Sequence, residues 1–318
     1  MRKKNILLSA GGTATAWHLS SLVFSRFSDH FNLFVCDINP PYLVPASQLA
    51  HRFIQVPPVD AAGYRDYMLS LFSEYNIHIY VPLIDADVYG FCTDDPDLER
   101  LGVFSASIPY HTSRLMHNKR TLSTYLEKNG LPVPRTLMLE DMGALEDQKV
   151  FVKPEQGFGS HGARAVVVDD IAALLAREPG LLVQSMCYEP EITVEVFNRR
   201  GMIHSLCRER LETKAGVCTK ARIWVDTALH SLSQRLCAVL DLPEAFCFQV
   251  MAGEDGTWLI TDVNPRLGAG TALSTAYGWS LASAALACWG GIEYPMQFLH
   301  TRSGDVHVVR VFQERVMD

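Results

Sequence analysis

The sequence lacks the features that mark several large functional classes. It has no basic excess, since 28 Lys and Arg stand against 35 Asp and Glu, a net charge of −7. Nucleic-acid-binding domains usually present a basic face, so we expect no nucleic acid as partner. No apolar stretch approaches the roughly 20 residues that span a bilayer, and the longest, about Trp279–Trp289, is broken by serine. We therefore expect no membrane association and a cytoplasmic location.

Paired cysteines and the common nucleotide-binding motifs are also missing. The eight cysteines are scattered, with no CxxC pair and no Cys/His cluster, and no GK[ST] tripeptide is present. This argues against a structural zinc site and favours free thiols in a reducing compartment. Gly11-Gly12 ends an apolar run but is not part of GxGxxG. We interpret it as a tight strand-to-helix turn, with a dehydrogenase-type nucleotide site using Asp37 as the alternative.

What is present at the N-terminal end is an alternation of strands and helices. Helical spacing covers about 14–27 and 64–75, and apolar runs predict strands at 5–9, 32–36, 77–82 and 103–105. Such alternation predicts a doubly wound parallel sheet over residues 1–108.

The rest of the chain has a different pattern. We expect one helix from Ser113 to Lys128, and then a strand, a glycine loop at 157–162 and a second strand, which together predict a β-hairpin flap. Alternating segments from residue 192 onward and a hairpin around 254–256 predict antiparallel sheets. The expected fold is α/β followed by α+β, divided into residues 1–108, 109–182 and 183–318.

One strand pair carries a candidate metal site. Asp262 and Asn264 lie two apart on one strand and so face the same way, and Gln249 joins them if the strand register places it opposite. Three oxygen donors suit Mg²⁺, and Arg266 just beyond could contact phosphates. The alternative is a polar solvent face that ends in an Asn-Pro turn.

A second candidate site combines a lysine with glycines. Lys153 directly precedes the loop 157–162, whose glycines let backbone amides approach a polyphosphate. The alternative is a flexible hairpin tip. A third and weaker candidate is the strand edge 184–186, whose backbone could bind an adenine, with Glu191 on ribose hydroxyls.

Taken in order, these motifs resemble the ATP-grasp superfamily, in the branch of carbamoyl-phosphate synthetase large-subunit domains and short carboxylate–amine (amino-acid) ligases. The resemblance covers essentially the whole chain. It rests on Lys119, Gly130-x-Pro132-x-Pro134, Val152-Lys153-Pro154, Gly157-x-Gly159-Ser160-x-Gly162, Gln184, Pro190-Glu191, Gln249 and Asp262-x-Asn264-Pro265-Arg266. It implies a pre-ATP-grasp domain followed by a two-lobed ATP-grasp fold.

The resemblance also implies roles for individual residues. Mg²⁺, which Mn²⁺ could replace, would be held by Gln249, Asp262 and Asn264. The catalytic residues would be Arg266, Lys153 and Arg210, the last binding an anionic substrate or intermediate. ATP would be bound by Lys119, Lys153, Gly157, Gly159, Ser160, Gly162, Gln184, Ser185, Met186 and Glu191. Two positions depart from the family pattern: Asp262 stands where Glu is usual, and Ser185-Met186 replaces an acidic-aromatic pair.

The function implied is an ATP-dependent ligation of a small carboxylate to an amine through an acyl phosphate, giving ADP and phosphate. A homodimer is suggested by analogy alone. Three alternatives stay open: phosphorylation of bicarbonate or carbamate with a partner, a non-catalytic ATP-binding sensor, and the dehydrogenase that would use Gly11-Gly12 and Asp37.

Overall fold

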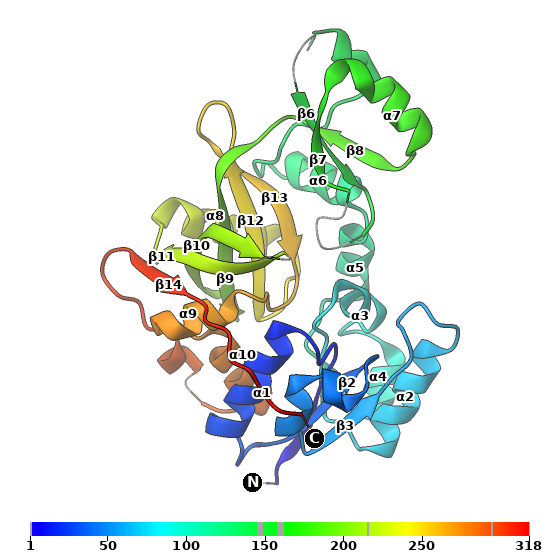
Figure 1. Ribbon diagram of the computed structural model, residues 1–318, viewed down its shortest axis with the longest axis vertical. Helices are drawn as coiled ribbons and strands as arrows, with labels where there is room; N and C mark the ends of the chain where they lie inside the picture. Colours follow the sequence, from blue (N-terminus) through cyan, green and yellow to red (C-terminus); the bar gives the residue numbers. More distant parts are fainter. Residues whose placement is uncertain (1, 145–148, 158–161, 215, 294, 318) are drawn as a thin grey trace.

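The computed structural model describes residues 2–144, 149–157, 162–214, 216–293 and 295–317, and its elements form three sheets (Figure 1). The N-terminal sheet has the order β3-β2-β1-β4-β5, and its neighbouring strands pair in parallel. Its strands are β1 (Lys4–Leu8), β2 (Phe31–Asp37), β3 (Arg52–Gln55), β4 (Ile79–Val81) and β5 (Phe104–Ser105). Strand β3 was not predicted from the sequence.

Helices cover both faces of this sheet because successive strand residues point in opposite directions. Ile6 and Leu8 of β1 belong to the core that includes α1 (Ala14–Arg26), whereas Leu7 belongs to the core that includes α2 (Tyr64–Glu74). The predicted doubly wound domain is therefore confirmed. Two short helices, α3 (Asp85–Gly90) and α4 (Pro96–Leu101), lie between β4 and β5 in sequence.

The single helix expected from Ser113 to Lys128 is wrong. The chain forms two helices, α5 (Tyr110–Met116) and α6 (Lys119–Lys128). Asn118 lies between them in extended conformation, and its side chain accepts a hydrogen bond from the backbone N–H of Thr121 at 3.0 Å. An Asn N-cap of this kind starts a new helix even where the apolar spacing continues.

The second sheet has three strands in the order β7-β6-β8 and a small core of its own. Its elements are β6 (Lys149–Pro154), β7 (Arg164–Val167), α7 (Ile171–Arg177) and β8 (Leu181–Gln184). β6 pairs antiparallel with β7, which confirms the predicted hairpin. Part of the loop between them, 158–161, lies outside the described residues.

The third sheet has the order β13-β12-β9-β10-β11-β14, and each neighbouring pair is antiparallel, as expected. The hairpin expected around 254–256 joins its strands β12 and β13. The strands are β9 (Tyr188–Arg199), β10 (Met202–Lys214), β11 (Val217–Trp224), β12 (Ala245–Ala252), β13 (Trp258–Asn264) and β14 (Val306–Val309). The helices of this part are α8 (Thr227–Val239), α9 (Thr271–Tyr277) and α10 (Leu281–Gly290). Short 3-10 helices occur at Pro41–Leu43, Pro45–Leu49, Leu139–Ala144, Val168–Asp170 and Pro295–Phe298.

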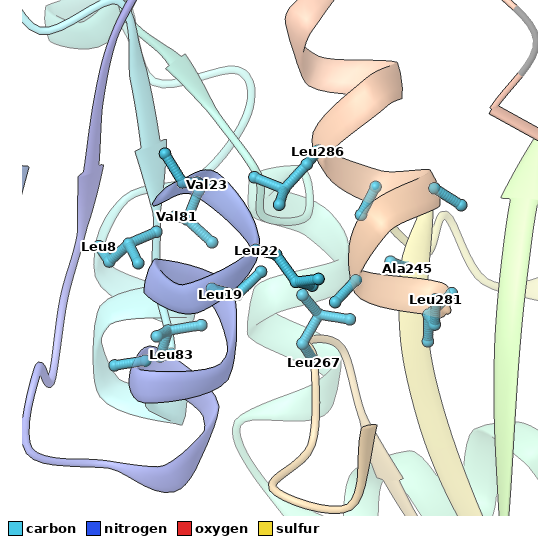
Figure 2. Close-up of a cluster of buried hydrophobic side chains, with 14 of the residues drawn as sticks. Leu8, Leu19, Leu22, Val23, Val81, Leu83, Ala245, Leu267, Leu281 and Leu286 are labelled. Carbon is cyan, nitrogen blue, oxygen red and sulfur yellow. The ribbon is translucent and has the colours of Figure 1, made fainter. Parts of the chain in front are cut away.

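The first and third sheets share one hydrophobic core. Leu19 and Leu22 of α1 lie in the same buried cluster as Leu281 and Leu286 of α10 (Figure 2). The chain after β14 adds a further link, because the guanidinium of Arg315 lies 4.4 Å from the ring centroid of Trp17. These two parts therefore pack as one body, whereas the three-stranded sheet stands at one end of the molecule on its own core (Figure 1). Among the described residues, no helix is both long and apolar enough to cross a membrane.

The glycine pair after β1 is a structural turn. A Cβ atom on Gly11 would lie 2.4 Å from Cγ1 of Val35, so only glycine fits there. The amide of Gly12 donates to Oδ2 of Asp37 at 2.7 Å, and Thr13 caps α1. Asp37 is buried and engaged with the turn itself, which removes the structural basis for a dinucleotide site that would use this carboxylate on a ribose.

Gly11→Ala is therefore expected to destabilise the protein by roughly 1–3 kcal/mol, the usual cost of an added methyl group in a packed interior. Gly90→Ala is the matched control, because a Cβ there meets nothing within 4 Å. Thermal unfolding of the two variants measures the difference. Equal melting temperatures would contradict the packing argument.

Candidate active site

The register of β12 and β13 assembles the predicted metal-binding set. Gln249 pairs directly with Asp262, and Asn264 lies two residues further along β13. Directly paired residues point to the same face of a sheet, so the three side chains share one face. The amide of Asn264 donates to Oδ2 of Asp262 at 3.1 Å, and all three residues are half-buried. The strand register therefore places Gln249 opposite Asp262, as the predicted metal site requires.

The set has a single carboxylate. Among the residues that the structure describes, no group of three or more His, Cys, Asp or Glu is placed to hold a metal ion. A cation here would therefore rely on Asp262 and on the amide oxygens of Gln249 and Asn264. These are hard oxygen donors, and a site with one or two carboxylates plus phosphates is typical of Mg²⁺.

Two lysines from outside this sheet line a cavity together with Asp262. Nζ of Lys153, on β6, donates to the carbonyl oxygen of Thr261 at 2.9 Å. Nζ of Lys119, the first residue of α6, donates to the carbonyl oxygen of Gly157 at 2.6 Å. Burial lowers the pKa of Lys153, and the charge of Lys119 lowers it further, whereas Asp262 opposes the shift. A buried cation next to a second cation is poised to receive an anion.

The lysines and Asp262 line one small cavity, together with Gln184 and Thr261. Its free volume is about 20 Å³, close to the space that a single water molecule needs. Ligand pockets usually measure hundreds of Å³. This cavity is therefore smaller than a nucleotide, and its walls must move apart before a nucleotide can occupy it.

Arg266 connects the metal-binding face to the N-terminal sheet. Its Nε donates to Oδ1 of Asp85 at 2.6 Å, and its Nη2 to Oδ1 of Asn264 at 3.4 Å. Asp85 begins α3, directly after β4. This pairing was not predicted from the sequence, because it joins residues 181 positions apart.

Part of the segment 184–186, which was predicted to bind an adenine, is already hydrogen-bonded within the protein. The side chain of Gln184 is buried and donates to Oγ of Ser123 and to the carbonyl oxygen of Pro134. The backbone N–H of Ser185 donates to the carbonyl oxygen of Arg135 at 2.9 Å. The strand edge expected at this point is thus already paired, which leaves the backbone from Met186 onward as the part that can face an adenine.

Glu191 and Arg210 form an ion pair. Nη1 of Arg210 lies 2.5 Å from Oε1 of Glu191, and its Nη2 donates to the carbonyl oxygen of Gly216. Among the described residues these two contacts use two of the five N–H donors of Arg210, which leaves three for the anion that its predicted role requires. In the glycine loop, Gly162 has a φ of +76°, which favours glycine, while Gly159 and Ser160 lie outside the described residues.

The buried ion pair between Glu195 and Arg208 was not predicted from the sequence. Both side chains are at most 4% exposed. The signal was present: Glu191, Thr193 and Glu195 alternate along β9, so polar residues at every second position, two of them charged, point to the face that carries Gln249.

Family models match two parts of this chain. The PylC-like N-terminal domain matches residues 6–105, and an ATP-grasp domain matches residues 116–270. The chain belongs to the ATP-grasp superfamily. The predicted superfamily and the expected fold class are confirmed. A search of the curated proteins found no match for this ATP-grasp chain.

Solved structures share the fold at low sequence identity. Carboxyaminoimidazole ribonucleotide synthase from Aspergillus clavatus, complexed with ATP, is 18% identical with a TM-score of 0.72, over 94% of this chain and 80% of that one. The biotin carboxylase domain of Hydrogenobacter thermophilus 2-oxoglutarate carboxylase is 13% identical with a TM-score of 0.76, over 96% and 74%. L-amino acid ligase from Bacillus licheniformis is 15% identical with a TM-score of 0.69, over 93% and 76%.

The lowered pKa of Lys153 predicts a pH dependence of nucleotide binding. A bound phosphate favours charged lysine, so this contribution is present below the pKa of Lys153 and is lost as pH rises through it. That loss should begin below 10.5, the ordinary lysine value. Calorimetric titration with Mg-ATP from neutral to alkaline pH should therefore show weakening affinity.

The arginine variant Lys153→Arg keeps its charge in this range and should flatten the profile. Lys149→Arg, on the exposed start of the same strand, is the control and should keep the slope of the unaltered protein. A profile of Lys153→Arg that coincides with that of the unaltered protein would show that Lys153 does not face the phosphates.

Proposed function

We propose that this ATP-grasp protein is an ATP-dependent ligase that phosphorylates a small carboxylate and joins it to an amine, releasing ADP and phosphate. The observation that carries the proposal is the convergence of Lys119, Lys153 and Asp262 on one cavity between two sheets. The two lysines carry the charge that would bind a triphosphate, and the oxygen donors opposite them would bind its metal ion.

The residues present fit Mg-ATP. Asp262, Asn264 and Gln249 would hold Mg²⁺, which neutralises charge on the phosphates when it is bound. Lys119 and Lys153 would contact the phosphates, and the backbone around Met186 would face the adenine. Arg210 contacts Oε1 of Glu191, and we assign Oε2 to the ribose hydroxyls.

The chemistry follows in two steps. An oxygen of the substrate carboxylate attacks the γ-phosphorus, the bond to ADP breaks, and an acyl phosphate forms. Arg266 and Lys153 offset the charge on the transferred group, a role that depends on positioning. The amine nitrogen then attacks the acyl carbon, phosphate leaves with the electron pair of the C–O bond, and the amine loses a proton. Closure of the small sheet excludes water, which would otherwise hydrolyse the acyl phosphate.

Asp262→Ala is expected to reduce substrate-dependent phosphate release by about 100-fold or more, the usual effect of removing one electrostatic contact to the transition state. Asp255→Ala is the control, because Asp255 is exposed at the tip of the same hairpin. Far-UV circular dichroism checks that both variants are folded. Unchanged release in a folded Asp262→Ala variant would remove this site from the reaction.

A phosphate-release screen over pairs of carboxylates and amines tests the reaction class. The proposal requires ADP and phosphate as products, and AMP with pyrophosphate would overturn it. Release that needs only bicarbonate would instead identify a bicarbonate-phosphorylating enzyme. Tight ATP binding with no release for any pair would identify a sensor.

A further inference from the structure

Helix α6 is attached to two different parts of the molecule. It lies beside the three-stranded sheet (Figure 1). Its residues Leu122 and Leu126 are buried in the core that includes α8 and strands of the six-stranded sheet. Its first turn is instead hydrogen-bonded to the three-stranded sheet, which has a core of its own. The helix is therefore held by one part through its apolar face and by the other through its polar N-terminal end.

Glu155, the residue after β6, accepts three of the hydrogen bonds from this N-terminal end. Its carbonyl oxygen accepts from the backbone N–H of Lys119 at 2.8 Å. Its carboxylate accepts from Nδ2 of Asn118 at 2.9 Å and from Nε of Arg120 at 2.6 Å. Because the first N–H groups of a helix have no partner within the helix, the carbonyl oxygen supplies an acceptor that α6 lacks. Glu155 thus contacts three successive residues, and Lys119 is the middle one.

Glu155 also extends the strand that carries Lys153. β6 pairs with β8 as far as Pro154 and Leu181. The backbone N–H of Glu155 continues this pairing, since it donates to the carbonyl oxygen of Gly180 at 2.9 Å. Residues two apart in an extended chain point to the same side. Lys153 and Glu155 therefore share one side of the strand, where Lys153 contacts β13 and Glu155 contacts α6.

The side chains of Lys119 and Arg120 reach the same part of the small sheet. Nζ of Lys119 donates to the carbonyl oxygen of Gly157 at 2.6 Å, two residues beyond Glu155. Nη2 of Arg120 donates to the carbonyl oxygen of Leu181 on β8 at 3.2 Å. Both candidate phosphate-binding lysines are therefore tied to one stretch of chain, 153–157. Lys153 is part of that stretch, and Lys119 is bound to it at two points.

The charge of Glu155 does not by itself favour an anion. Burial raises the pKa of Glu155, but hydrogen bonds from Asn118 and Arg120 and the charge of Arg120 lower it, and the net shift is downward. The carboxylate is therefore ionised at neutral pH. A negative charge next to a phosphate site repels the phosphates. Its presence beside Lys119 is consistent with a role in holding that lysine rather than in binding the nucleotide.

We propose that Glu155 is a positioning residue of the nucleotide site, which fastens the first turn of α6 to the end of β6. Its bonds hold the ammonium groups of Lys119 and Lys153 at a fixed separation, so that both lysines meet the phosphates together. The inference rests on the proposed function for the nucleotide itself. It adds a residue that acts on the nucleotide only through Lys119.

The test is a calorimetric titration of the full chain with Mg²⁺ and a non-hydrolysable ATP analogue, which involves no turnover. Glu155→Gln keeps the size of the side chain but has one acceptor oxygen in place of two. Affinity should fall about 10-fold, the effect of losing one charged hydrogen bond. Removal of a negative charge alone predicts the opposite sign, because it favours an anion. Unchanged or tighter binding by Glu155→Gln would overturn the inference.

Two further variants complete this comparison. Glu155→Asp keeps the charge but is one methylene shorter, so it should also weaken binding, which covers the case in which Glu155→Gln does not fold. Glu178→Gln is the matched control. It removes a carboxylate of the same small sheet, one that pairs with Arg164 at 2.8 Å, and it should leave the affinity unchanged.

A double-mutant cycle separates positioning from a general loss of structure. Lys119→Met removes the ammonium group and should weaken binding of the analogue. Adding Glu155→Gln to Lys119→Met should cause no further loss, because the effect of Glu155 passes through the missing group. Losses that multiply would show that Glu155 acts on the whole sheet and would overturn the inference.

The remaining outcomes are also decisive. An analogue that does not bind, or that binds Lys119→Met as tightly as the unaltered protein, contradicts the inference. Failure of the proposed ligase reaction is seen separately. In that case the analogue binds and depends on Glu155 through Lys119, yet no pair of carboxylate and amine releases phosphate from ATP.

Discussion

The register between β12 and β13 is the constraint on which the site depends. It places Gln249 opposite Asp262, and because side chains alternate along a strand, a shift by one residue would turn the metal-binding set to the other face. Buried apolar residues prevent that shift: Phe248 and Val263 pair with each other and belong to the core that includes α8. The same packing that stabilises this sheet therefore fixes where its oxygen donors point.

The distribution of cores indicates which part of the candidate site can move. One cluster joins the N-terminal sheet to α9 and α10, so Asp85 and Arg266 meet inside a single packed body. The three-stranded sheet has a separate small core, and the contact from Lys153 to Thr261 is one hydrogen bond across the cleft. Elements with few buried contacts to the rest open at low free-energy cost. Opening is thus expected to move Lys153 away from Asp262 while the metal-binding face stays in place.

Local patterns in the sequence were sufficient for the fold class and much of the site. Alternating strands and helices predicted the parallel sheet, and the two-residue spacing of Asp262 and Asn264 predicted their shared face. Strand β3 was not predicted because its four residues include only two apolar ones. The break between α5 and α6 at Asn118 was not predicted because the helical spacing of apolar residues continues across it. The pairing of Ser185 with Arg135 could not be predicted, since it joins segments that are 50 residues apart and depends on tertiary packing.

A crystal structure with Mg²⁺ and a non-hydrolysable ATP analogue would show directly whether this sheet face binds the metal ion and the nucleotide. We expect a metal ion about 2.1 Å from an oxygen of Asp262 and from the amide oxygen of Asn264. We also expect that Nζ of Lys153 and Nζ of Lys119 contact the phosphates, with the three-stranded sheet closed over them. A nucleotide bound elsewhere, or a metal ion held without Asp262, would contradict this assignment.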